Sequence, residues 1–92
     1  METTKISNVI SYLRKKQKIN QAKLAKKSGV DRAHFVMVER GKRSVSLDLL
    51  EKISPVLNVE TYEIIFLSHF NKKEYDEALE KIRKIKESPK LG

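Results

Sequence analysis

Lysine and arginine side chains gather in one third of the chain, where they could bind an anion. Residues 14–43 contain eleven of them and only two acids, Asp31 and Glu39, whereas all 92 residues together carry a net charge of +8. A solvated helix face usually mixes both signs, so this one-sided block is informative. It indicates an anionic partner, and the stretch SGVDRAHFVMVERGKR (28–43) closes the block.

Side chains for catalysis or metal binding do not form a recognisable set. The chain has no cysteine, which excludes disulfides and thiolate metal sites and suits a reducing cytoplasm. His34 and His69 lie far apart with no paired carboxylates beside them, and the isolated glycines form no phosphate-binding loop. We therefore expect no enzymatic activity, no metal and no cofactor, and no ligand pocket or sensor domain is recognisable. No apolar run approaches the roughly 20 residues that cross a bilayer, so we expect no membrane partner.

Helical spacing of apolar residues runs through the whole chain and predicts an all-α fold. The inward face of the first helix carries Ile6, Val9, Ile10 and Leu13. Further helices are predicted for residues 21–28, 31–40, 47–57, 61–70 and 74–88. The signals that begin and end the early helices are Asn20, Asp31 and Ser46 as N-caps and Gly29 and Gly41 as stops.

Residues 47–57 hold a proline within an apolar stripe. The side chains expected to turn inward are Leu47, Leu50, Ile53 and Leu57. Pro55 should kink this helix or shift its last turn, because proline cannot donate a backbone hydrogen bond. We expect one compact domain of five short helices in residues 1–70 and an additional amphipathic helix in residues 71–92.

The spacing between Gln21 and Val38 is more specific than the rest of the pattern. Ala25 is small enough for two helices to cross closely, and Gly29, four residues later, permits a sharp turn. Phe35 and Val38 then hold the second helix against the core. These are the requirements of a helix-turn-helix, whose second helix is free to enter a major groove.

The stretch INQAKLAKKSGVDRAHFVMVERGKRSVSLDLLEKISPVLNV (19–59) resembles the lambda-repressor-like, or Cro/Xre, helix-turn-helix family. Its apolar, small, Gly, Glu and Arg-Gly positions are in register with the family pattern, and the resemblance covers about residues 6–66. It implies a five-helix DNA-binding domain with a recognition helix in residues 31–40. The implied function is sequence-specific transcriptional regulation, and we favour a repressor that acts as a homodimer on a pseudo-palindromic operator.

The resemblance also implies roles for individual residues. Those that would face base edges are Arg32, Ala33, Val36 and Met37. Those that would contact the DNA backbone are Asn20, Gln21, His34, Arg40, Lys42 and Arg43. Arg32 is the strongest candidate, because a guanidinium can bind guanine O6 and N7 together. The alternative for Arg32 is a phosphate contact, and the alternative for Met37 is a position in the core. Gln21 would also brace the start of the recognition helix.

Arg14 and Glu39 match family positions that form an ion pair between the first and third helices. Glu39 is nearly the only acid in a basic region, where a free carboxylate would repel phosphate, so we interpret the pair as structural. The alternative is two unrelated surface charges. Three residues depart from the family pattern: Val36 replaces an often polar residue, Val45 a frequent proline, and Ser28 a usually apolar one. Val36 leaves the base contacts open.

Apolar side chains near the C-terminus exceed what a small core needs and suggest a dimer interface. They are Tyr62, Phe66, Phe70, Tyr75, Leu79 and Ile82. Alternatively, the last helix folds back over the core. The same surface could instead bind a different protein, as in an antitoxin-like or partner-controlled regulator. A pure interaction module that reads no bases is disfavoured by the charge concentrated around the motif.

Overall fold

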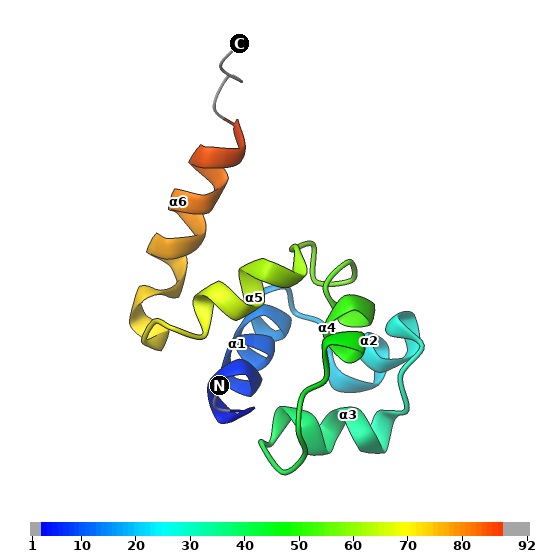
Figure 1. The fold of residues 1–92 in the computed structure, drawn as a ribbon. Helices are drawn as coiled ribbons and strands as arrows, with labels where there is room; N and C mark the ends of the chain where they lie inside the picture. The colour runs from blue at the N-terminus through cyan, green and yellow to red at the C-terminus, as the bar shows by residue number, and fades with distance from the viewer. Residues whose placement is uncertain (1–2, 88–92) are drawn as a thin grey trace.

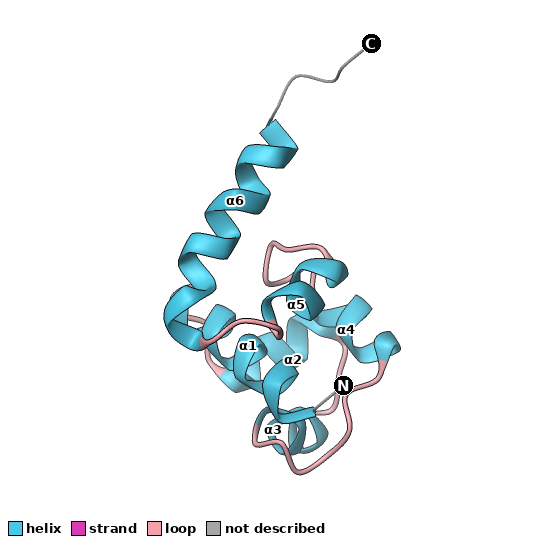
Figure 2. Ribbon diagram, turned by 60° about the vertical axis from the view of Figure 1, so that its left-hand side comes forward, coloured by secondary structure: helices cyan, strands magenta, loops and turns pink. Residues whose placement is uncertain are grey.

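The computed structural model describes residues 3–87, and this range consists of helices and the turns between them (Figure 1, Figure 2). Its elements are α1 (Thr3–Lys16), α2 (Gln21–Ser28), α3 (Arg32–Glu39), α4 (Leu47–Ile53), α5 (Thr61–Leu67), the 3₁₀ turn η1 (Lys72–Glu74) and α6 (Tyr75–Glu87). The prediction of an all-α chain, with five short helices and a sixth appended, is confirmed. The outer ends of the predicted segments 1–70 and 71–92 lie outside the described residues.

Side-chain caps begin three of the short helices at the predicted places. The side chains of Asn20, Asp31 and Ser46 each accept a hydrogen bond from the backbone N–H three residues further on, at 2.7, 3.0 and 3.1 Å. Each cap satisfies a backbone donor that has no partner inside the helix. These bonds set where α2, α3 and α4 start, and therefore where the turn between α2 and α3 lies.

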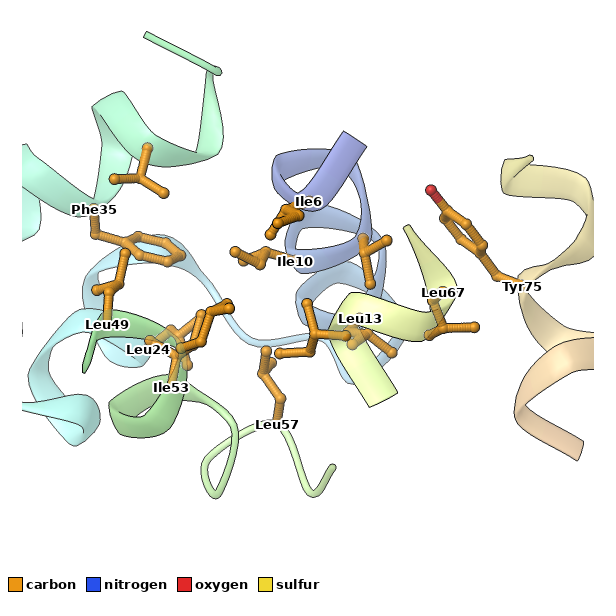
Figure 3. Packing of buried hydrophobic residues seen from close by; sticks show 14 of the residues in the cluster. Ile6, Ile10, Leu13, Leu24, Phe35, Leu49, Ile53, Leu57, Leu67 and Tyr75 are labelled. Atoms are coloured by element: carbon orange, nitrogen blue, oxygen red, sulfur yellow. The ribbon is translucent and has the colours of Figure 1, made fainter. Parts of the chain in front are cut away.

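The core joins the first five helices around fully buried side chains. Figure 3 shows Phe35 of α3 packed beside Leu24, Leu49 and Ile53, with Ile10 reaching toward them from α1. Phe35, Leu24 and Ile10 have no exposed surface. Burying one such side chain contributes about 1.5–3 kcal/mol to stability. This cluster therefore holds α3 firmly against the rest of the domain.

Two helices end several residues earlier than predicted. α4 ends at Ile53 rather than at residue 57, because Pro55 cannot extend the ladder of backbone hydrogen bonds; Leu57 is buried all the same. α5 ends at residue 67 rather than 70, where hydrogen bonds between residues three apart replace the α-helical ladder. Leu47, expected to face inward, is 60% exposed. Leu49 takes the buried place because it lies one helical turn before Ile53.

α6 packs on the domain at its base and stands away from it at its other end (Figure 1). Tyr75 and Ala78 are buried, and the ring of Tyr75 meets that of Tyr12 edge-on with 5.1 Å between centroids. Ile85, by contrast, is 74% exposed. Tyr75 was expected at a dimer interface, and this is wrong, because the ring is buried inside the protomer against α1.

Two ion pairs fasten α6 to the domain. At the base, Lys16 Nζ lies 2.6 Å from the carboxylate of Asp76, which also accepts a hydrogen bond from the Tyr12 hydroxyl. Further along, Lys86 Nζ lies 2.6 Å from Oε1 of Glu63 in α5. Hydrogen bonds from Lys16 and Tyr12 lower the pKa of Asp76. Burial, reinforced by Asp76, raises the pKa of Tyr12 to about 12, so the carboxylate is charged and the hydroxyl protonated at neutral pH.

Gly29 makes the turn between α2 and α3. Its φ angle is 71°, in the left-handed region that residues with a Cβ rarely adopt. The N–H of Val30 then bonds to the carbonyl of Ala25 at 2.9 Å and closes the end of α2. A Cβ built on Gly29 would meet no atom within 4 Å. Only backbone strain therefore opposes a larger residue at this position.

Replacing Gly29 with valine should lower the free energy of unfolding by about 1–2 kcal/mol, because a β-branched residue is strained at positive φ. Gly29→Asn is the matched control and should lower it by less, since asparagine tolerates this conformation better. Urea denaturation followed by circular dichroism measures both values. A valine variant as stable as the original chain would show that the turn does not require the left-handed conformation.

Candidate nucleic-acid interface

α3 divides into a buried face and an outer face. Phe35 and Val38 are completely buried and seat the helix on the core. The residues of the outer face, together with the residue that follows the helix, are Arg32, Ala33, Val36, Met37 and Arg40. They fall into two rows with a spacing of four residues, so the side chains within each row lie above one another along the helix.

The outer face combines the kinds of group that can contact DNA bases. Arg32 and Ala33, at the first two positions of the helix, are exposed. Met37 is 36% exposed, which places it on the surface rather than in the core, and Val36 is partly buried within its row. A guanidinium can donate paired hydrogen bonds to guanine, and small or apolar side chains can touch a thymine methyl group. His34 is exposed but lies outside both rows.

Cations without an acidic partner follow α3 and lie on the neighbouring helix α2. Arg40, Lys42 and Arg43 follow the helix and are exposed, and none of them forms an ion pair within residues 3–87. Three more exposed cations in the same state lie on α2, namely Lys23, Lys26 and Lys27. These three were not singled out from the sequence. The signal that could have found them is the charge block itself, since every cation not paired internally remains available to a phosphate.

An ion pair beneath this surface ties α3 to α1. Arg14 holds Glu39 through two parallel bonds, Nε to Oε2 at 2.8 Å and Nη2 to Oε1 at 2.7 Å. Its remaining nitrogen, Nη1, donates to the carbonyl of Ile19 at 2.8 Å. The Arg14 and Glu39 side chains are only 11% and 6% exposed. This paired geometry is the strong form of charge-assisted hydrogen bond, so Glu39 presents no free negative charge to an approaching anion.

Two further polar bonds secure the same end of α3. Gln21 Nε2 donates to Glu39 Oε1 at 3.1 Å, and the buried Ser7 Oγ donates to the carbonyl of Val38 at 2.5 Å. Gln21 was expected to brace the start of the recognition helix; it braces the end instead, because Glu39 is the last residue of α3. Ser7 was not singled out, although a serine on the inward face of an amphipathic helix is a signal for such a bond.

Removing one member of the buried pair should destabilise the domain strongly. Arg14→Met should lower the free energy of unfolding by about 3–5 kcal/mol, because it leaves the Glu39 carboxylate buried without a partner, and Glu39→Met should do the same to the guanidinium. The double variant should lose much less than the sum of the two single losses. Urea denaturation of the four proteins measures the coupling, and strictly additive losses would contradict a paired unit.

Acidic and histidine side chains do not gather into a metal site in the described residues. Between residues 3 and 87, no group of three or more His, Cys, Asp or Glu residues is placed to hold a metal ion. None of the helices between residues 3 and 87 is both long and apolar enough to cross a membrane.

Known proteins share both the sequence pattern and the fold. A family model described as helix-turn-helix matches residues 10–64, more than half of the chain. The chain is 40% identical over 50 residues to the control protein C.BamHI of Bacillus amyloliquefaciens, and the match spans 54% of this chain and 62% of that protein. The crystal structure of the clp gene regulator ClgR from Corynebacterium glutamicum has a similar fold, with a TM-score of 0.71 over 95% of both chains at 17% identity.

These findings agree with the geometry of α2 and α3. The matched region contains the turn at Gly29, the buried residues Phe35 and Val38 that pack α3 on the core, and the exposed cations on α2 and after α3. The resemblance drawn from the sequence is confirmed. The chain belongs to the Cro/Xre-type helix-turn-helix family of DNA-binding transcriptional regulators.

Proposed function

We propose that this protein regulates transcription by inserting α3 into the major groove of a specific DNA sequence. The observation that carries the proposal is the set of exposed cations at both ends of α3. Arg32 lies at the start of the helix, and Arg40, Lys42 and Arg43 follow its end. None of the four has an acidic partner within residues 3–87. Each cation that meets a phosphate releases condensed counterions and so favours binding. A surface that docks on a neutral protein has no need of such a set.

The proposed interface separates sequence reading from affinity. Arg32, Ala33, Val36 and Met37 would lie against base edges, with Arg32 as the main reading residue. The residues proposed to hold the DNA backbone are Asn20, Gln21, His34, Arg40, Lys42 and Arg43. Backbone contacts fix the orientation of the protein on the duplex but carry no sequence information. The two groups should therefore respond differently to substitution.

One domain of this kind reads few base pairs, so the proposed active form is a homodimer on a pseudo-palindromic operator. Tyr62 and Phe66 are 58% and 42% exposed on α5. The ring of Phe66 meets that of Phe70 edge-on at 5.0 Å, which extends the aromatic surface beyond the helix. Leu79 and Ile82 of α6 are also partly exposed. A two-fold pairing would suit half-sites about 34–36 Å apart.

Repression is the form of regulation that we favour. A dimer bound to its operator blocks transcription simply by occupying the DNA. Activation would require a further surface that contacts the transcription machinery. The outer face of α3 and its cations would be sufficient for repression. They provide no additional surface of the kind that activation would require.

Substituting Arg32 and Arg43 should separate the two roles. Selection from randomised duplexes at near-physiological salt first supplies the preferred sequence. Arg32→Ala should then reduce discrimination at one base position by about 1–3 kcal/mol and leave non-specific binding largely intact. Arg43→Ala, the matched control, should weaken binding to all sequences alike and lower the salt slope by about one unit. Binding titrations on matched and mismatched duplexes at several salt concentrations measure both effects.

Two results would contradict this assignment. An unchanged base preference in Arg32→Ala would mean that another side chain reads the sequence. A pool that enriches no sequence, although binding remains sensitive to salt, would mean that the fold holds DNA without reading it.

Phe66→Ala should shift the protein toward monomers, because it removes an aromatic anchor from the proposed interface. We expect the dimer dissociation constant to rise roughly tenfold or more. Leu47→Ala is the control, since Leu47 is a large apolar residue, 60% exposed, on a different helix. Sedimentation equilibrium without DNA measures the constants. If both variants, or neither, change the association, the surface of α5 is not the interface.

A further inference from the structure

A cleft is lined by α1 and by the turn that joins α5 to α6, beside the base of α6. Figure 1 shows these elements side by side. Its volume is about 840 Å³, within the range of about 300–1,000 Å³ that is usual for small-molecule sites. One wall comes from α1 and the other from residues 69–76. Because the two walls are far apart in the sequence, no local motif marks this site.

Positive charge dominates the lining of the cleft. Lys5, Lys15 and Lys16 lie on the α1 wall, and Lys72 lies on the opposite wall. Lys16 is neutralised by Asp76, the one acid in the described lining. Lys5, Lys15 and Lys72 form no ion pair within residues 3–87. Unpaired ammonium groups on two walls of one cleft attract an anion with more than one charge.

Neutral groups complete the cleft. Asn8, Ser11 and Asn71 add side-chain amides and a hydroxyl, all of which can donate hydrogen bonds to phosphate oxygens. The rings of Tyr12 and Phe70 add an apolar part to the walls. This lining suits an ester with a charged head and an apolar body. The cations and hydrogen-bond donors would bind the head, and the aromatic rings would contact the body.

The cleft uses a different side of α1 from the one that holds α3. Ser7 and Arg14 point to α3 and make hydrogen bonds with Val38 and Glu39. The lysines of the cleft lie on the side that faces the base of α6. A ligand in the cleft and a duplex on α3 would therefore not compete for the same side chains.

We propose that this cleft binds a small phosphorylated ligand, a phosphate or diphosphate ester with at least two negative charges. The ligand neutralises Lys15 and Lys72 and bridges α1 to η1, while Lys5, about 15 Å away along α1, adds only longer-range attraction. Because it binds the folded protein only, it raises the thermal stability. The proposal stands independently of DNA binding by α3.

The first arm of the test uses pyrophosphate as the probe, titrated into the 92-residue chain at constant ionic strength and followed by amide NMR shifts and by Tm. We expect saturable one-site binding with shifts in residues 5–16 and 69–76 and a rise in Tm. Lys15→Gln and Lys72→Gln should each weaken binding about threefold, and the double variant about tenfold. Lys27→Gln is the matched control, since it removes the same charge from α2, outside the cleft, and should leave the affinity unchanged.

Shifts that do not saturate, or an equal loss in the Lys27 variant, would reveal general attraction of anions to a basic protein and overturn the proposal. The second arm repeats the titration on the complex with a selected duplex. Unchanged pyrophosphate binding supports a separate small-ligand site, whereas mutual exclusion would assign the cleft to backbone phosphates of DNA and overturn it. If no duplex is selected but pyrophosphate still binds, only the proposed reading of DNA fails.

Discussion

The buried pairing of Arg14 with Glu39 is the constraint on which the rest of the arrangement depends. It joins α1 to the last residue of α3 through two short bonds, and Gln21 of α2 reaches the same carboxylate. Three helices thus meet at one negative charge inside a cationic region. Burial of these charges is tolerated only while they are paired, so the pairing favours a single orientation of α3. That orientation decides which side chains face outward.

An α3 of eight residues has little surface to share between packing and recognition. Phe35 and Val38 take the inner side entirely, and the outer side offers only a few positions to a base edge. The cations around it add attraction without discrimination. Symmetric pairing is the simplest way for so short a helix to specify a longer site. α5 is the place where aromatic surface is left over once the core has been filled.

Features that depend on neighbours in the chain could be predicted from the sequence, and features that depend on distant contacts could not. The three caps, the turn at Gly29 and the two sides of α3 follow from backbone chemistry and helical spacing. Leu47 and Tyr75 were misplaced, because the helices that a segment meets decide which of its sides is buried. The bond from Gln21 to the end of α3 and the cleft beside α1 likewise depend on tertiary packing. Ser28 is a departure that the sequence did reveal, because it is a polar residue at a position that is usually apolar in the family. Its hydroxyl is buried with no hydrogen-bond partner in the described chain.

Two unlike kinds of contact hold α6, and dissolved salt affects only one of them. Tyr75 and Ala78 anchor the base by burial. Two ion pairs add to this hold, Lys16 with Asp76 at the base and Lys86 with Glu63 further along. Salt at physiological concentration screens exposed charges beyond about 8–10 Å and weakens closer ones as it rises. The Glu63 side chain is only 7% exposed, so rising ionic strength should loosen its pair with Lys86 much less than it loosens the exposed pair of Lys16 with Asp76 at the base. Burial of the Tyr75 ring therefore keeps the base of α6 in place when dissolved salt weakens the ion pair beside it.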